Sequence, residues 1–290
     1  MTSKARLRLG TRGSQLALTQ SKLVAHAVTN ATGIDVELVV ISTKGDRIKN
    51  IPLPAIGAKG LFTAELESSL RDGGIDFAVH SLKDLPTDDP DGLILGAIPT
   101  REDPRDCLVG PALADLSEGA VVGSGSLRRR EQLLQLRSDL VVNDIRGNVH
   151  TRLEKRDRGD FEATVLAMAG LARLGIDRPD MNPLSVDMMV PAVGQGALGV
   201  QCRDGDPRVL ECLTMIDHEE TRACVSGERV FLAAFGGGCN VPAGCHIVRQ
   251  DGRYKLYAFV AKPSGEGLRI VQEGDDPISL GAAAAEVAKA

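Results

Sequence analysis

Short apolar runs separated by turn-forming residues fill the first two-thirds of the chain. Between the runs, apolar side chains recur at helical spacing, as at Phe62, Leu66 and Leu70, and Ser14 is placed to cap a helix. Another helix is expected over residues 127–136. This alternation predicts an α/β fold with mainly parallel sheets, in which ligands bind at the carboxyl ends of strands. The expected buried strands are residues 36–41, 77–80, 93–98, 120–124, 140–145 and 163–169.

Two segments interrupt this pattern. Residues 99–106 are charged and punctuated by proline, which predicts a linker or hinge, and the glycine-interrupted residues 190–202 predict a second crossover. A chain of 290 residues is long for one compact core, so two or three domains are expected. After about residue 218 a small α+β domain is expected. Its elements would be a helix at 219–234, strands at 254–261 and 268–272, and an alanine-rich terminal helix.

The composition narrows the class of function. Hydrophobic residues make up 43% and charged residues 25%, as in ordinary soluble proteins. A net charge of −5 and an aromatic content of 3% argue against a nucleic-acid surface, because such surfaces are basic and stack bases on aromatic rings. No segment predicts a membrane span, and the N-terminus lacks the apolar run of a signal peptide. We therefore expect a cytoplasmic protein without nucleic-acid or membrane partners.

Basic side chains fall where predicted strands end or helices begin. Arg12 precedes the Ser14 cap, residues 124–130 (SGSLRRR) follow one strand, and Arg146 follows the next. A guanidinium binds carboxylate through a fixed fork of donors, and a helix N-terminus adds a favourable dipole. An anion site and a solvated helix face both stay open as interpretations of Arg128, Arg129 and Arg146. The solvated face is preferred for Arg130, Lys155 and Arg156.

The stretch DFAVHSLKDLP (76–86) is a buried strand that ends in polar side chains. Ser81, Lys83 and Asp84 follow the strand, and we expect Lys83 and Asp84 to lie together at its carboxyl end. An ionised carboxylate there would suit the stabilisation of a developing cation. A surface ion pair that caps a loop is the alternative. His80 is interpreted as a packed strand residue rather than a base.

Six cysteines stand at irregular spacings without a CxxC pair, so neither a disulfide framework nor a metal site is expected. Cys239 differs from the others because it follows three glycines in AFGGGCNVPAG (234–244). This segment is either a plain loop around a small buried thiol or a loop that presents a nucleophile.

Together, these motifs resemble those of the porphobilinogen deaminase, or hydroxymethylbilane synthase, family. The similarity runs in order from residue 11 to about 244, and beyond residue 245 it extends only to a small terminal domain. The motifs are TRGSQLAL (11–18), GAKGLFTAELE (57–67), HSLKDLP (80–86), GSGSLRRR (123–130), IRGNVHTRL (145–153), AGLARLG (169–175), PAVGQGALG (191–199) and GGGCNVPAG (236–244).

The resemblance implies a transferase of haem biosynthesis that joins four porphobilinogen molecules head to tail on a covalent dipyrromethane primer. Ammonia would leave at each step, and hydrolysis would release the linear tetrapyrrole hydroxymethylbilane. The implied fold is two periplasmic-binding-protein-like lobes around a cleft plus a small C-terminal α+β domain. The implied domains are 1–99 with 192–217, then 100–191, then 218–290. A monomer that passes its product to uroporphyrinogen-III synthase is expected, with no metal.

The resemblance also assigns roles to residues. Cys239 would carry the dipyrromethane, and Asp84 would hold pyrrole N–H groups and stabilise the cation formed as ammonia leaves. Asp46, Lys59 and Phe62 would lie on or near an active-site loop (about 44–60). The residues that would bind cofactor and substrate carboxylates, or assist there, are Arg12, Ser81, Lys83, Ser124, Ser126, Arg128, Arg129, Arg146, Arg152, Arg173 and Gln195.

Two positions depart from the family pattern. The family often has Thr-Ser-Ser before Leu-Arg-Arg, where this chain has Ser124-Gly125-Ser126, and Gly13 stands where a larger residue is common. Cys245 lies beside the loop but outside the motif and is interpreted as a packed residue. A two-lobed module that binds or senses a small dicarboxylate without catalysis is the alternative function. It leaves the Lys83–Asp84 turn and the glycine-cysteine loop without a role.

Overall fold

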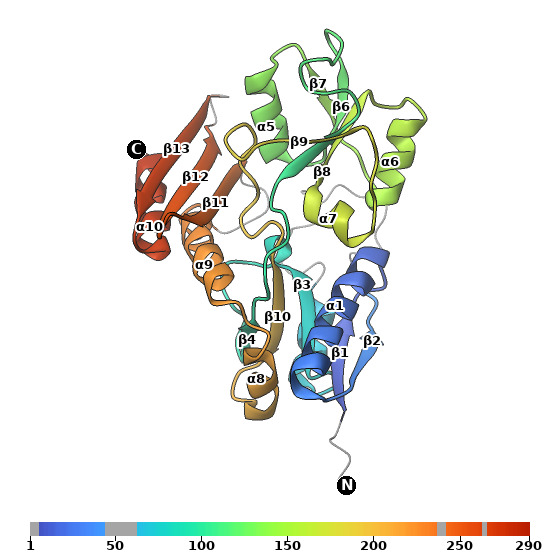
Figure 1. Cartoon of the computed structure of the whole chain (residues 1–290), viewed down its shortest axis with the longest axis vertical. Coiled ribbons are helices and arrows are strands. Elements are labelled where there is room, and N and C mark those ends of the chain that lie inside the picture. Colours follow the sequence, from blue (N-terminus) through green and yellow to red (C-terminus); the bar gives the residue numbers. More distant parts are fainter. Residues whose placement is uncertain (1–5, 44–62, 237–241, 263–265) are drawn as a thin grey trace. The chain divides into compact units, whose positions relative to one another are not determined.

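The computed structural model describes residues 6–43, 63–236, 242–262 and 266–290 (Figure 1). The chain divides into two compact units. Unit 1 consists of Met1–Arg101 and Ala197–Arg222, and unit 2 consists of Glu102–Gly196 and Ala223–Ala290. The chain therefore passes between units inside both segments that were predicted as linker and crossover.

Unit 1 is built on one five-stranded sheet with the order β2-β1-β3-β10-β4. β1 pairs in parallel with β2 and β3, whereas β10 is antiparallel to both β3 and β4. Four of the five strands thus run in the same direction. The strands are β1 (Leu7–Thr11), β2 (Val36–Val40), β3 (Phe77–Ser81), β4 (Leu93–Ala97) and β10 (Leu198–Arg203). The helical elements are α1 (Gln15–Thr32), α4 (Ala64–Arg71), the 3-10 turn η1 (Leu82–Asp84) and α8 (Pro207–Thr214).

Each face of this sheet has its own apolar core. One face packs against α1 and α8 through residues such as Val28, Phe77 and Leu213. The other packs against α4 through Leu66 and Leu70. Helices on both faces explain why the strands read as continuous apolar runs rather than alternating ones.

Unit 2 contains a second five-stranded sheet with the order β7-β6-β8-β5-β9. Here β6 pairs in parallel with β7 and β8, and β5 is antiparallel to β8 and β9. The two sheets have the same arrangement: β7, β6, β8, β5 and β9 occupy the positions of β2, β1, β3, β10 and β4. They differ in where the antiparallel strand occurs along the chain, since β10 is the last strand of its sheet and β5 is the first of its own. The strands are β5 (Asp106–Val109), β6 (Val121–Gly123), β7 (Val141–Asn143), β8 (Ala163–Ala167) and β9 (Met181–Pro183). The helices are α5 (Leu127–Leu136), α6 (Val149–Asp157) and α7 (Met168–Arg173).

The C-terminal part of unit 2 is a three-stranded antiparallel sheet with the order β11-β12-β13. Its elements are α9 (Glu219–Ala233), β11 (Ala243–Gln250), β12 (Arg253–Ala261), β13 (Gly267–Gly274) and α10 (Pro277–Lys289). Figure 1 shows α10 packed along this sheet, and small residues such as Ala284 and Ala285 form the contact. Cys245 lies fully buried on β11, which confirms its interpretation as a packed residue.

The predicted fold class is confirmed: two α/β sheets with mainly parallel strands and a small C-terminal α+β part. The predicted helix over 127–136 matches α5 residue for residue. The sequence patterns did not identify β1, β5, β9, β10 or β11.

Candidate functional site

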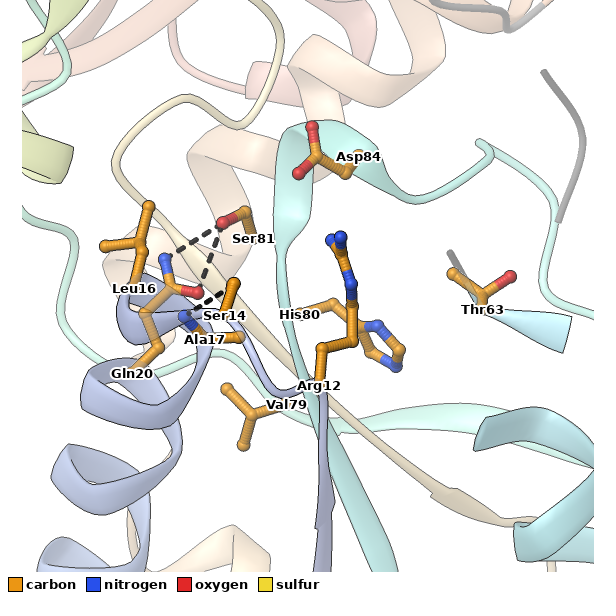
Figure 2. Close-up of a pocket in the computed structure, with 10 residues that line it drawn as sticks. All are labelled: Arg12, Ser14, Leu16, Ala17, Gln20, Thr63, Val79, His80, Ser81 and Asp84. Carbon is orange, nitrogen blue, oxygen red and sulfur yellow. Dashed lines mark hydrogen bonds between the residues drawn. The ribbon is translucent and has the colours of Figure 1, made fainter. Parts of the chain in front are cut away.

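A pocket in unit 1 lies where β1 and β3 end (Figure 2). Figure 2 shows the Arg12 guanidinium extending from the end of β1 into the space beside the turn that carries Asp84. The two strands are parallel neighbours, so their carboxyl ends meet at one edge of the sheet. The lining residues are Arg12, Ser14, Leu16, Ala17, Gln20, Thr63, Val79, His80, Ser81 and Asp84.

Local backbone chemistry places these side chains. The Ser14 hydroxyl accepts a hydrogen bond from the Ala17 amide at 3.3 Å and so caps the start of α1. Arg12 therefore lies in the short segment between the end of β1 and the start of α1. At the other strand, β3 ends at Ser81 and the chain turns through η1, which places Asp84 at its end. Asp84 is exposed and Lys83 is half-buried. The two predicted residues therefore share one turn at the rim of the pocket.

A buried polar contact joins the two sides of the pocket. The Gln20 side-chain amide on α1 donates to the Ser81 hydroxyl at 2.9 Å, and Gln20 is almost fully buried. The sequence analysis did not single out Gln20. The feature that could have identified it is a polar residue at a buried position of α1.

His80 is neutral in this pocket. Its side chain is buried, and burial lowers its pKa to about 4, with the Arg12 charge acting in the same direction. Its Nε2 atom is buried and has no hydrogen-bond partner among the described residues. The interpretation of His80 as a packed strand residue is confirmed.

Unit 2 gathers its arginines around one buried carboxylate. Asp106, at the start of β5, is fully buried. Arg128 donates to it from Nη1 at 2.7 Å, and Arg129 donates from Nε at 3.0 Å and from Nη2 at 2.7 Å. Both arginines are themselves buried, at 4% and 6% exposure. They are therefore not on a solvated helix face.

The pKa values in this cluster follow from burial and charge. Burial alone raises the pKa of Asp106, but the charges of Arg128 and Arg129 outweigh it and hold that pKa well below its usual range. Burial lowers the pKa of Arg128, and the Asp106 charge opposes this. With two arginines and one aspartate, the cluster carries a formal charge of +1.

Three further predicted arginines lie in unit 2 near helix ends. Arg146 pairs with Asp144 at 2.9 Å and is half-exposed. Arg152 donates to the Gly147 carbonyl at 2.8 Å, and Arg173 donates to the Gly196 carbonyl at 2.7 Å. Burial lowers the pKa of both Arg152 and Arg173, and the nearby charge of Arg129 lowers that of Arg152 further. Arg129 and Arg152 are therefore close enough to interact.

The predicted serines have structural contacts in the same region. Ser126 caps α5 by accepting the Arg129 amide at 3.4 Å, and the Ser124 hydroxyl accepts the Ser126 amide at 3.3 Å. Gln195 is fully buried, and its side-chain amide donates to the Asp106 carboxylate at 2.9 Å and to the Pro104 carbonyl at 2.7 Å.

The glycine departures have different steric consequences. A Cβ at Gly125 would lie 2.8 Å from Oδ1 of Asp144, so a serine there would require that side chain to move. A Cβ at Gly13 would meet only Val40, at an ordinary 3.6 Å. Position 13 therefore has room for a larger residue, and position 125 does not without rearrangement.

One interpretation was wrong. Arg156 does not sit on a solvated helix face: its Nη1 lies 2.7 Å from Asp180 and 3.2 Å from Asp157, and its side chain is mostly buried. Arg178 completes this network by pairing with both aspartates. Arg178 and Asp180 lie more than twenty positions after Arg156, so helical spacing alone did not reveal this network.

Cys239, Asp46, Lys59 and Phe62 lie outside the described residues. The five described cysteines are all buried, and burial raises the pKa values of Cys107 and Cys202 to about 11. None of the five is placed to act as an exposed thiolate. Among the described residues, no cluster of potential metal ligands occurs, and no helix has the length and apolar character to cross a membrane.

Two family models match this chain. "Porphobilinogen deaminase, dipyromethane cofactor binding domain" matches residues 7–211, and "Porphobilinogen deaminase, C-terminal domain" matches residues 222–290. The chain belongs to the porphobilinogen deaminase family. The family resemblance inferred from the motifs is thereby confirmed, and so is a dipyrromethane cofactor.

Individual relatives agree with this assignment over most of their length. Porphobilinogen deaminase from Syntrophotalea carbinolica is 47% identical over 270 residues, which covers 92% of this chain and 86% of the relative. The Brevibacillus brevis protein of the same name is 45% identical over 285 residues, covering 96% and 92%. Among solved structures, the methionine binding protein MetQ is similar with a TM-score of 0.47 and 13% identity, covering 77% of this chain and 94% of that one.

Proposed function

We propose that this chain is a hydroxymethylbilane synthase, a transferase of tetrapyrrole biosynthesis. It condenses four porphobilinogen molecules head to tail, releases ammonia at each step, and finally releases the linear tetrapyrrole by hydrolysis. The observation that carries this proposal is the match of both family domains, which together span nearly the whole chain. The geometry of the two units supports a role for each in this reaction.

In unit 1, Asp84 is the residue proposed to carry the chemistry. It is exposed at the end of η1, beside the Arg12 side chain in one pocket. Loss of ammonia leaves positive charge shared with a pyrrole nitrogen, and a fixed carboxylate stabilises that charge more than the neutral ring. Arg12, Ser81 and Lys83 would bind the carboxylates of the substrate around it.

In unit 2, the buried arginines are proposed to hold carboxylates of the cofactor and of the growing chain. Each pyrrole ring of porphobilinogen carries an acetate and a propionate, so chain growth brings two carboxylates per ring. A buried cluster with an excess positive charge suits such anions, since it is stabilised when a carboxylate arrives. The residues assigned here are Ser124, Ser126, Arg128, Arg129, Arg146, Arg152, Arg173 and Gln195.

The dipyrromethane is proposed to be attached through Cys239. When bound, the group supplies the primer to which substrate rings are joined. The chain's part is to hold its carboxylates, and the donor set of unit 2 fits that requirement. The thiol assignment is supported by elimination, because every described cysteine is buried. Asp46, Lys59 and Phe62 are proposed to lie on the active-site loop.

Several features of the cellular setting belong to the same proposal. The protein would act as a cytoplasmic monomer and pass its product to uroporphyrinogen-III synthase.

Three domains are proposed, at residues 1–99 with 192–217, 100–191 and 218–290. Each would contain one of the three sheets, which each have a separate apolar core. The alternative of a non-catalytic dicarboxylate-binding module is not favoured, because the family match extends over the cysteine-bearing C-terminal domain.

The mass of the intact protein tests the proposal. Purified wild-type protein should be heavier than its sequence mass by one dipyrromethane, and peptide mapping should place the addition on Cys239. Cys239→Ser should fold but lack the added mass, since a hydroxyl is a weaker nucleophile than a thiol near neutral pH. Cys245→Ser is the matched control and should keep the cofactor. A fully active protein without the addition, or an addition on Cys245, would contradict the proposal.

A further inference from the structure

Asp106, Arg128 and Arg129 form a buried group, here called the Asp106 cluster. Its internal contacts use only some of the N–H donors of the two arginines. A guanidinium has five N–H donors. Nη1 of Arg128 donates to Asp106 and, at 2.6 Å, to the Val190 carbonyl. Arg129 donates twice to one oxygen of Asp106 and once, from Nη1 at 2.9 Å, to the Val165 carbonyl. Each arginine is therefore anchored to both the carboxylate and a backbone carbonyl.

The unused donors form defined edges. For Arg128, the whole edge made by Nε and Nη2 has no hydrogen-bond partner among the described residues. Arg129 keeps one N–H on each of its Nη atoms. Nε and Nη2 of Arg128 are not among the buried side-chain atoms that lack a partner in the described chain, so this edge is not sealed from solvent. A carboxylate binds such a guanidinium edge through two parallel hydrogen bonds.

Asp106 is itself held in place. Its Oδ1 atom accepts from Arg129 and from the fully buried Gln195 side chain, whereas Oδ2 accepts from Arg128. The two carboxylate oxygens are thus divided between the two arginines. A rotation of the carboxylate would break contacts to both at once.

We propose that Asp106 is a positioning residue for the anion site of this enzyme, a role that rests on the proposed function. By binding the inner donors of Arg128 and Arg129, it fixes which guanidinium edges face an incoming cofactor or substrate carboxylate. Gln195 supports this role by orienting the Asp106 carboxylate. Asp106 has no exposed atoms and does not itself contact the ligand.

A role as a simple counter-ion predicts the opposite result from a role in positioning. If Asp106 only neutralised one arginine, its removal would raise the positive charge of the site and strengthen carboxylate binding. If it only supported the fold, removal would reduce the amount of folded protein and leave the affinity of the folded fraction unchanged. If it positions the arginines, removal weakens carboxylate binding in spite of the added charge.

The experiment measures cofactor attachment rather than turnover. Cofactor-free full-length protein, produced in a host that makes no porphobilinogen, is incubated with a series of porphobilinogen concentrations. Intact-mass spectrometry follows the fraction of chains that gain the cofactor. In Asp106→Asn, the half-saturating porphobilinogen concentration should rise at least about tenfold, the scale for losing a charge-assisted contact. An unchanged or lower value would overturn the inference.

Asp139→Asn is the matched control. Asp139 binds Arg137 through two hydrogen bonds of 2.8 and 2.7 Å in the same unit, but this pair lies near the other end of α5 and is partly exposed. Its half-saturating concentration should stay within about twofold of wild type, as for a surface pair. A tenfold rise in this control as well would overturn the assignment to Asp106.

A second variant covers the case in which Asp106→Asn does not fold. Gln195→Leu keeps all three charges of the cluster and removes the hydrogen bond that orients Asp106, together with the one to the Pro104 carbonyl. We expect its half-saturating concentration to rise at least about threefold, and no change would overturn the inference. Failure of the wild-type chain to gain any cofactor would instead contradict the proposed function. The two failures are therefore distinguishable.

Discussion

Units 1 and 2 share one strand arrangement, but the charged side chains beside their sheets differ in kind and in burial. In unit 1, the loop after β1 and the turn after β3 bring together one arginine, an exposed carboxylate at Asp84 and a neutral histidine. In unit 2, the first turn of α5, which follows β6, carries Arg128 and Arg129 against the buried Asp106. The carboxylate is thus exposed in one unit and enclosed in the other.

In the proposed reaction, this difference would separate two tasks. An exposed carboxylate on a short turn can approach the reacting ring, where a charge develops during the step. A buried carboxylate cannot reach a ligand, but it can hold arginines in fixed directions for ligand carboxylates. The shared strand order supplies the positions, and burial would decide which of the two proposed tasks each acidic residue performs.

The largest effect is expected in unit 2, on stability. Asp106→Asn leaves two buried guanidiniums without their counter-charge, and we expect the free energy of unfolding to fall by about 4 kcal/mol. Asp139→Asn removes a partly exposed pair and should cost about 0.5 kcal/mol. Urea unfolding of cofactor-free proteins measures both values. Equal losses would mean that burial does not distinguish the two aspartates.

A double variant sharpens this result. Asp106→Asn combined with Arg129→Gln removes one charge of each sign, so the two like charges no longer face each other. The double variant should be more stable than Asp106→Asn alone. If the two losses simply add, the cluster is not electrostatically coupled.

In unit 1 the largest effect falls on turnover. Asp84→Asn keeps the shape of the side chain but removes its charge, and turnover should fall at least about 100-fold, the scale for one electrostatic group. Asp84→Glu keeps the charge and should retain more activity than Asn. Asp88→Asn, at an exposed position four residues later, is the control and should be near wild type. Single-turnover ammonia release from cofactor-loaded protein distinguishes these outcomes, and an Asn variant as fast as wild type would make Asp84 structural.

The third expected effect is a different dependence of stability on pH for His80 in unit 1 and Asp106 in unit 2. The folded-state pKa of His80 is about 4, below its unfolded value of 6.5, so between these values the unfolded chain binds more protons. Stability from this source is complete above about pH 6.5 and is lost as the pH falls toward 4. At about pH 5 the loss should be about 2 kcal/mol relative to neutral pH. Asp106 contributes nothing in this window, because its pKa is depressed and its own loss begins only below the unfolded value of 3.8.

The measurement is urea unfolding at several pH values. His80→Gln should flatten the slope between about pH 6.5 and 4, whereas His26→Gln, at an exposed position on α1, should not. A wild-type slope in His80→Gln would show that the acid-sensitive group lies elsewhere.

The sequence predicted most of the fold where the pattern was strong and local. The α5 boundaries were predicted from the position of this segment directly after a strand, and the structure adds the Ser126 cap at its start. β5 was missed because it begins with a charged residue inside a segment that looks like a linker, and Asp106 is buried only because arginines more than twenty positions away neutralise it. β10 was missed because Gly199 and Gln201 interrupt its apolar pattern, although both are buried in the sheet.

The candidate site shows the same limit. Strand-end positions and residue types pointed to the Asp84 turn and left an anion site open for Arg128, Arg129 and Arg146, whereas Arg173 came from the family resemblance. The sequence could not show which arginine donors are used inside the protein, because those contacts depend on backbone carbonyls such as Val165 and Val190. Gln195 was predicted as a cofactor-binding residue from the resemblance alone. Its described contacts instead connect it to Asp106, which is the basis for the positioning role proposed above.

The smallest expected effect compares the caps of α1, which follows β1 in unit 1, and α5, which follows β6, the strand at the corresponding position in the unit 2 sheet. Ser14 caps α1 and Ser126 caps α5, so Ser→Ala at either position should lower the free energy of unfolding by about 1 kcal/mol. Their effects on cofactor attachment should differ. Ser14 accepts from the Ala17 amide, whereas Ser126 accepts from the amide of Arg129, whose side chain binds Asp106. Only Ser126→Ala should therefore raise the half-saturating porphobilinogen concentration for attachment, by about twofold, in the mass-spectrometric assay. Equal shifts in both variants would mean that the cap does not act through Arg129, and the two helix starts would then differ only in the side chains they carry.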